Sequence, residues 1–300
     1  MQELIQHVVN GLSLGAIYAL IALGYTMVYG ILQFINFAHS EIFMLGAYIG
    51  YYTGNALGLN DKPSVMGFFV TLFVSMLGAA LVGFLVEFLA YRPLRKAPRI
   101  NVLITAVGVS FLFQFGAQMM FGANPRPFPA LMDTSQVFKI GAVQIDMIQI
   151  IVIAVTIALM LILEAVLFRT RAGKAMRAVS HNHNVALLLG INVDLIISLT
   201  FMIGSALAGA AGILVGMTYP KIEPLMGLML GMKAFVAAVL GGIGNIRGAV
   251  AGGLLMGLAE QLVVSYTLPT FRDALAFAIL ILILIFKPKG LFGKVVAEKV

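Results

Sequence analysis

The chain has 300 residues, of which 61% are hydrophobic and only 10% are charged, and its mean hydropathy is +1.03. Soluble domains contain about 45–50% apolar and about 25% charged residues, so this composition excludes a soluble protein and predicts an integral membrane protein. The formal net charge of +7 is divided among separate short segments, which argues against a nucleic-acid partner, and the lack of cysteine excludes disulfides and thiolate metal sites.

Long apolar segments alternate with short polar connections along the chain. A helix needs about 20 residues to cross a bilayer. We predict spans at roughly 5–31, 40–57, 65–90, 100–121, 147–168, 194–217, 228–245, 248–267 and 271–287. All ten prolines fall outside these spans, as expected for a residue that breaks the helical hydrogen-bond ladder. The N-terminus lacks the basic flank and cleavage site of a signal peptide, so we expect the first span to be retained.

This order predicts an all-α, polytopic transmembrane helix bundle of eight or nine spans in one domain, residues 1–300. Segment 40–57 is short and opens with polar residues, and the connection near 241–248 is tight and rich in glycine. Irregular backbone survives at membrane depth only where protein or a cavity shields it. Eight crossings plus one re-entrant segment therefore remain the alternative to nine.

The basic residues are unevenly divided between the two faces that alternating spans create. Of the 19 Lys and Arg residues, 13 fall on one face, namely Arg92, Arg95, Lys96, Arg99, Arg169, Arg171, Lys174, Arg177, Arg247, Lys287, Lys289, Lys294 and Lys299. The other face has Lys62, Arg126, Lys139, Lys221 and Arg272. Because cytoplasmic loops carry the excess of Lys and Arg, we predict a cytoplasmic C-terminus and an extracytoplasmic N-terminus.

Small residues recur at helical spacing within the spans. One series contains Gly46, Gly50 and Gly54, and another contains Gly204, Ala208, Gly212 and Gly216. Small side chains four residues apart leave a smooth stripe that lets helix backbones approach closely. We predict that these glycines pack helices together, and the same stripes would also let helices tilt against one another.

Polar residues gather where the first span turns into the second. Asn36, His39, Ser40 and Glu41 are the members of this group. Polar groups at depth are costly unless they are paired or face water, so they either cap the start of the next helix, with Ser40 and Glu41 as the capping pair, or line a pathway. His39 is no metal ligand by itself, because the other histidines lie in different segments.

Other charged residues also fall within or beside the spans. Glu87 and Glu164 stand near the ends of their spans, each followed by arginines, and are expected to form ion pairs there. Lys233 and Glu260 fall within separate spans, and an ion pair between them would neutralise two buried charges.

Motifs that carry catalysis are absent from the sequence. There is no phosphate-binding loop, and the glycine-rich run 241–248 lacks the lysine that such a loop requires. Signatures of serine hydrolases, zinc proteases and intramembrane aspartyl proteases are missing as well. We therefore predict that the chain is not an enzyme and needs no cofactor or metal.

One sizeable polar, basic segment interrupts the apolar chain at 169–193. Gly173, Lys174, Arg177 and Ala178 open a helical stretch, and Asn182, Ala186 and Gly190 follow at four-residue spacing before Ile191. Small residues on such a stripe let a short helix seat in a groove of another protein, where Lys174 and Arg177 can meet acidic groups. We predict that this cytoplasmic segment docks a soluble partner.

Here the sequence resembles the permease subunits of ABC importers for branched-chain amino acids, of the type called the H permease. The pattern Arg-Ala-x-x-x-x-Asn-x-x-x-Ala-x-x-x-Gly-Ile at 177–191 resembles the ATPase-coupling loop of that family, although His183 stands where the general importer motif has glycine. The segments 15–30, 36–39, 46–48, 231–235, 240–244, 248–249 and 287–293 resemble the family in order and spacing, so the likeness covers almost the whole chain.

The resemblance implies a type II-like importer fold that moves leucine, isoleucine and valine by alternating access. It implies a related second permease, two ATP-binding subunits, an extracytoplasmic amino-acid-binding protein and a place in the bacterial inner membrane. It also implies that the first helix lines the path, so Tyr18, Tyr25, Asn36 and His39 are the expected pathway residues. Permeases for urea or short amides, and a carrier or channel without an ATPase partner, remain alternatives.

Overall fold

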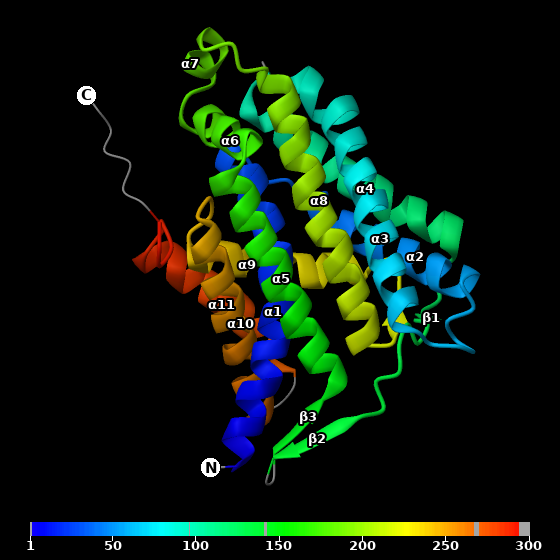
Figure 1. Ribbon diagram of the computed structural model, residues 1–300. Coiled ribbons are helices and arrows are strands. Elements are labelled where there is room, and N and C mark those ends of the chain that lie inside the picture. The colour runs from blue at the N-terminus through cyan, green and yellow to red at the C-terminus, as the bar shows by residue number, and fades with distance from the viewer. Residues whose placement is uncertain (1, 96, 141–142, 267–269, 294–300) are drawn as a thin grey trace.

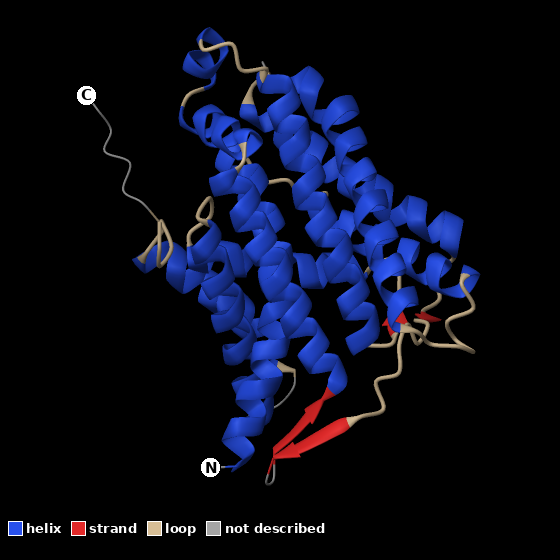
Figure 2. Cartoon of the chain, in the orientation of Figure 1, coloured by secondary structure: helices blue, strands red, loops and turns tan. Residues whose placement is uncertain are grey.

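The computed structural model describes residues 2–95, 97–140, 143–266 and 270–293. Within these ranges the chain folds into a bundle of α-helices with a few short strands at one end (Figures 1 and 2). Three of the basic residues assigned to the cytoplasmic face, Lys96, Lys294 and Lys299, lie outside the described residues.

Six helices of the described chain are long and apolar enough to cross a membrane. They are α1 (Gln2–Leu32), α3 (Val65–Val86), α4 (Arg99–Phe121), α5 (Met147–Arg169), α8 (Val193–Thr218) and α10 (Ile246–Tyr266). The other three predicted spans correspond to shorter helices, α2 (His39–Ala56), α9 (Met226–Gly241) and α11 (Phe271–Phe286), which have 18, 16 and 16 residues. Eight or nine crossings therefore stay a prediction.

Several element boundaries differ from those predicted. Helix α3 stops at Val86 and continues as a π-helical turn, η1 (Glu87–Tyr91), and a 3₁₀ turn, η2 (Arg92–Leu94), so the predicted span 65–90 is not one regular helix. The predicted span 228–245 ends early at Gly241, because Gly242 and Gly244 adopt φ values of 102° and 93° that are open mainly to glycine. Helix α10 then starts at Ile246.

The chain is mostly helical, as predicted, and short strands are added to the bundle at one end. Strand β1 (Arg126–Pro127) pairs antiparallel with β4 (Lys221–Ile222), and β2 (Val137–Ile140) pairs antiparallel with β3 (Val143–Asp146). These strands occur in connections whose polar composition indicates only loops. They lie at the end where α1 begins, whereas α6 (Arg171–His181) and α7 (His183–Leu188) lie at the opposite end (Figure 1).

Helices α1 and α8 form the centre of the bundle. They run in opposite directions, because the start of α1 and the end of α8 meet at the same cavity, which Gln6 and Thr218 both line. They cross where Gly24 faces Gly204. Helix α1 packs against α10, and α8 packs against α3. Helix α2 packs on α8 and α3, and α9 packs on α1 and α10. The units α1–α3 and α8–α10 thus make matching contacts in inverted orientation, as inverted repeats of membrane transporters do.

The outer surface of the bundle is apolar. On α3, Phe73 and Leu77 are exposed, and on α4, Leu112 and Phe115 are exposed. Isolated exposed apolar residues are ordinary in soluble proteins, but rows of them along whole helices indicate contact with lipid or a partner helix. By contrast, α1 is buried over most of its length.

Candidate functional site

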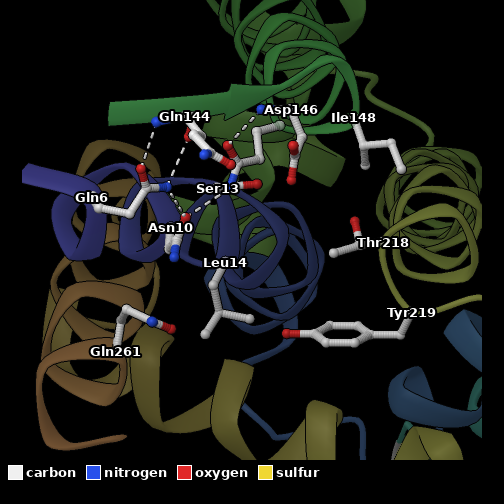
Figure 3. Close-up of a pocket in the computed structure, with 11 residues that line it drawn as sticks. Gln6, Asn10, Ser13, Leu14, Gln144, Asp146, Ile148, Thr218, Tyr219 and Gln261 are labelled. Atoms are coloured by element: carbon white, nitrogen blue, oxygen red, sulfur yellow. Dashed lines mark hydrogen bonds between the residues drawn. The ribbon is translucent and has the colours of Figure 1, made fainter. Parts of the chain in front are cut away.

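A polar cavity of about 580 Å³ lies at the end of the bundle where α1 begins (Figure 3). Uncharged polar side chains supply most of its lining. The lining residues are Gln6, Asn10, Ser13, Leu14, Gln144, Asp146, Ile148, Gln149, Thr218, Tyr219 and Gln261. Ligand pockets of proteins occupy about 300–1,000 Å³, so the cavity is large enough for a small metabolite.

Amide hydrogen bonds join α1 to the β3–α5 corner at the rim of this cavity. The Gln6 side chain donates to the carbonyl oxygen of Gln144 at 2.8 Å and accepts from its amide nitrogen at 2.7 Å. The Gln149 side chain donates to Asn10 Oδ1 at 2.8 Å. These are drawn as dashed lines in Figure 3. The bonds hold the start of α5 against α1 and shape one wall of the cavity.

A cluster of charges lies next to this cavity. Lys233 Nζ is 3.1 Å from Glu260 Oε1, so the ion pair expected between α9 and α10 is present. Lys233 also contacts Asp273 Oδ1 at 2.6 Å, and Arg272 is paired with Glu260. No sequence pattern pointed to Arg272 and Asp273, because they stand in the first turn of α11 and reach the cluster only through the packing of that helix.

The four expected pathway residues lie in two separate groups within the core. The Tyr18 hydroxyl donates to Glu260 Oε2 at 2.7 Å. Further along α1, the ring of Tyr25 meets the ring of His39 edge to face at 4.7 Å between centroids. In the turn before α2, Asn36 Oδ1 accepts from the hydroxyl of Tyr91 at 2.6 Å. All four side chains are buried and none lines the cavity, although Tyr18 follows the lining residue Leu14 by one turn of α1.

The polar turn before α2 does not cap the helix in the way that the sequence suggested. Helix α2 begins at His39 with Ala38 at its N-cap, and Ser40 Oγ donates to the carbonyl oxygen of Phe37 at 2.9 Å. Glu41 points instead to α4, where it accepts from Gln114 Nε2 at 2.7 Å. The capping prediction was wrong because α2 starts one residue earlier than Ser40 and the carboxylate finds its partner on another helix.

Some polar atoms of this turn are buried without a partner. Among the described residues, Asn36 Nδ2, both ring nitrogens of His39 and Glu41 Oε2 have no hydrogen-bond partner. Buried polar groups are usually paired, and exceptions occur where a structure binds a ligand or changes state. The turn between α1 and α2 is consequently a place where the conformation seen here leaves hydrogen-bonding capacity unused.

Three of the glycines expected at helix contacts, Gly46, Gly204 and Gly212, lie where backbones meet. A Cβ on Gly46 would come within 2.5 Å of Gly209 Cα, and one on Gly212 within 2.6 Å of the carbonyl oxygen of Phe43. At Gly204 the nearest atom would be the carbonyl oxygen of Gly24 at 3.2 Å. Gly50 and Gly216 face side chains rather than backbone, Ile213 and Phe128 respectively.

The basic segment at 169–193 forms two short helices rather than one. Thr170 caps α6, accepting from the amide nitrogen of Gly173 at 3.1 Å, so the helix begins before Gly173. Asn182 breaks the helix and caps α7 by accepting from the amide nitrogens of Asn184 and Val185. The four-residue stripe through Asn182, Ala186 and Gly190 is therefore not one continuous helical face, and Gly190 ends α7 with φ of 75°.

Helix α6 has a buried apolar side and an exposed basic side. Gly173, Met176 and Val179 are buried against the bundle. The exposed positions at helical spacing are Arg171, Lys174, Arg177 and His181. Ala178 is half-buried between these sides, as is Ile191 after α7. Arg177 also lies 5.1 Å from the ring centroid of Phe168 and donates to the carbonyl oxygen of Leu167, which fixes α6 on the end of α5.

Ion pairs gather at the same end as α6. Glu87 is buried and accepts from Ser198 Oγ at 2.5 Å and from Arg95, while Arg92 contacts Asp194 at 2.8 Å. Glu164 pairs with Arg247 at 2.7 Å. Glu87 and Glu164 therefore both form ion pairs, as expected. Their partners, Arg95 and Arg247, lie further along the chain than the nearest arginines in sequence. In the described part of the chain, no three His, Asp or Glu side chains are close enough to hold a metal ion.

Comparisons with known proteins cover almost the whole chain. Residues 7–284 match the family model described as the permease component of the branched-chain amino acid transport system. The permease protein BraD of a high-affinity branched-chain amino acid transport system from Pseudomonas aeruginosa is 42% identical, covering 99% of this chain and 98% of that protein. The corresponding LivH protein of Escherichia coli is 41% identical, covering 99% of this chain and 97% of that protein.

More distant proteins show weaker likeness. A probable branched-chain amino acid permease of Methanocaldococcus jannaschii is 27% identical, covering 91% of this chain and 88% of that protein. The solved structure of PsaBC from Streptococcus pneumoniae in complex with Fab aligns with 96% of this chain and 91% of that chain, with a TM-score of 0.43 and 14% identity. A likeness at that level carries no argument about the fold.

Proposed function

The chain belongs to the family of branched-chain amino acid transport system permease components, and on this premise we propose that it translocates leucine, isoleucine and valine as the transmembrane subunit of an ATP-driven importer. It is a multi-pass protein of the inner membrane and a transport subunit rather than an enzyme. The observation that carries the substrate assignment is identity of 41–42% to named branched-chain amino acid permeases over 99% of the chain. This similarity favours branched-chain amino acids over urea or short amides.

The segment 169–193 acts, in this proposal, as the docking site for an ATP-binding subunit. The exposed side of α6 carries Arg171, Lys174 and Arg177, which supports binding to acidic groups of a partner. Its buried side lies near the end of α1, where Met176 and Thr26 line a small pocket. A push on α6 would reach α1 through this contact, which is the coupling that alternating access requires.

The polar cavity is then the extracytoplasmic entrance, and the N-terminus lies outside. Support comes from the position of the cavity at the end of the bundle opposite α6 (Figure 1). Tyr18 would stand at its inner limit, and Tyr25, Asn36 and His39 would line the part of the path that opens later in the cycle. A second permease and two ATP-binding subunits would complete the membrane complex, to which an extracytoplasmic binding protein would deliver the amino acid.

Reconstitution tests this function directly. The chain is assembled with its companion subunits in proteoliposomes that contain ATP and Mg²⁺, and the binding protein is added outside with radiolabelled leucine or urea. Accumulation of leucine that requires ATP and the binding protein is expected. Accumulation of leucine by the chain alone, or uptake of urea in place of leucine by the complex, would refute the proposal.

A further inference from the structure

Four charged side chains come together between α9, α10 and α11, and we call them the charge quartet: Lys233, Glu260, Arg272 and Asp273. Glu260 has 0% of its side chain exposed and Lys233 has 7%, so both charges are removed from water. The quartet has two positive and two negative members and no net charge when all are ionised. Ionised groups at membrane depth are costly and usually mark a pathway for ions or substrate.

One contact and two positions along helices connect the charge quartet to the polar cavity. Tyr219 lines the cavity with its hydroxyl aimed inward (Figure 3), and its side chain interacts with Arg272. Gln261 lines the cavity directly after Glu260 in α10. Tyr18, which donates to Glu260, follows Leu14 by one turn on the same side of α1. The quartet is therefore adjacent to the inner limit of the cavity.

We propose that the charge quartet recognises the two opposite charges of a zwitterionic amino acid as it leaves the cavity. This inference rests on the proposed function and names the site of that function. The substrate ammonium replaces a cation beside Glu260 or Asp273, and the substrate carboxylate takes the cation that is released. Exchange of partners keeps every charge paired, whereas a ligand with one net charge leaves an unpaired charge in a buried site.

The exposure of the quartet suits such an exchange. Glu260 and Lys233 are fixed in the core, but the side chains of Arg272 and Asp273 are 35% and 48% exposed. The α11 members can therefore turn away while the buried members hold the ligand. Leu14 and Ile148 are the apolar residues of the cavity lining and offer contact to a branched aliphatic side chain.

Binding to the assembled transporter without its binding protein tests this recognition. Saturation-transfer NMR is suited to the weak affinity expected for a pathway site. Three probes of similar shape are compared: leucine, 4-methylpentanoate, which lacks the ammonium, and isoamylamine, which lacks the carboxylate. The variants are Glu260→Gln and Lys233→Met, and the matched controls are Glu223→Gln and Lys221→Met in an exposed pair 3.6 Å apart.

The wild-type complex and both controls are expected to bind leucine at least about tenfold more tightly than either analogue. Glu260→Gln leaves an excess positive charge and should shift the preference toward 4-methylpentanoate. Lys233→Met leaves an excess negative charge and should shift it toward isoamylamine. Equal binding of the three probes to the wild type, or an unchanged order in both variants, overturns the proposal.

Two further measurements keep the outcome interpretable. If a single variant does not assemble, the double variant Lys233→Met with Glu260→Gln is used, because it restores zero net charge to the site. A preference for leucine that is retained in this double variant overturns the inference. Wild-type leucine uptake in proteoliposomes is measured in parallel. If the wild type takes up leucine normally but the variants bind the three probes in the wild-type order, the charge quartet is not the recognition site and the proposed function stands. If the wild type takes up no leucine, the proposed function itself is rejected.

Discussion

The backbones of Gly24 in α1 and Gly204 in α8 face each other at the centre of the bundle. A Cβ on Gly24 would lie 2.9 Å from the carbonyl oxygen of Gly204, and a Cβ on Gly204 would lie 3.2 Å from the carbonyl oxygen of Gly24. Each helix therefore approaches the other across a surface without side chains. This reciprocal contact lets the two oppositely directed central helices pack closely, as small residues do in membrane bundles.

Replacing Gly24 by alanine should destabilise the protein. The new methyl group would come within 2.2 Å of Nε2 of the buried His39 and 2.9 Å of the carbonyl oxygen of Gly204, so the His39 ring and the contact between α1 and α8 must shift. Overpacking of this kind costs about 1–3 kcal/mol, which thermal unfolding followed by circular dichroism would detect. Gly108→Ala is the control, because nothing lies within 4 Å of the place that its new methyl group would take, and equal melting of the two variants would contradict the prediction.

Reversing a charge on the exposed side of α6 should weaken binding of the ATP-binding subunit. Lys174→Glu is the sharper variant, since Arg177 also holds α6 on α5 and its loss would disturb the segment itself. We expect about tenfold weaker association in a pull-down titration, with insertion unchanged. Lys221→Glu at the opposite end is the control. Wild-type association of the Lys174 variant would exclude this side of α6 as the docking surface.

Two arginines near the start of α8 should differ in their effect on stability. Arg95 pairs with Glu87, whose side chain is 0% exposed, so Arg95→Met leaves a buried carboxylate uncompensated and should cost about 3–5 kcal/mol. Arg92 pairs with Asp194 where both side chains are well exposed, and Arg92→Met should cost about 0–1 kcal/mol. Unfolding in detergent measures both, and similar losses for the two variants would count against this account.

Stability of the α7 segment should fall in mild acid. Partial burial, and then the nearby positive charge of Arg95, lower the pKa of His183 below its ordinary value of 6.5. As the pH falls, the His183 imidazole is protonated in the unfolded segment before it is protonated in folded α7. The folded form is therefore most stable above about pH 6.5. Its stability decreases below that pH until the folded form is protonated as well. Hydrogen exchange of 183–188 at neutral and acidic pH reports this change. The same acid response in a His183→Gln variant would assign it to another group.

Much of the architecture follows from local sequence, because periodicity and composition act on neighbouring residues. The apolar segments predicted six of the long helices to within a few residues, and the polar, basic composition of 169–193 marked the segment that forms α6 and α7. The break at Asn182 is also local in cause, because the side chain of Asn182 caps α7. Hydrophobic periodicity indicated neither this break nor the π-helical turn at Glu87–Tyr91.

Composition and spacing along the chain were enough to predict an apolar helix bundle of the membrane, to place its basic segment, and to make Lys233 and Glu260 candidates for a buried pair. Only the tertiary structure shows that Arg272 and Asp273 join that pair and that Glu41 contacts Gln114. It also shows that a polar cavity lies next to the charged cluster. The physical reason is that each of these contacts joins different helices. Their geometry depends on how whole helices pack, whereas spacing along one segment fixes only which side of its own helix a residue occupies.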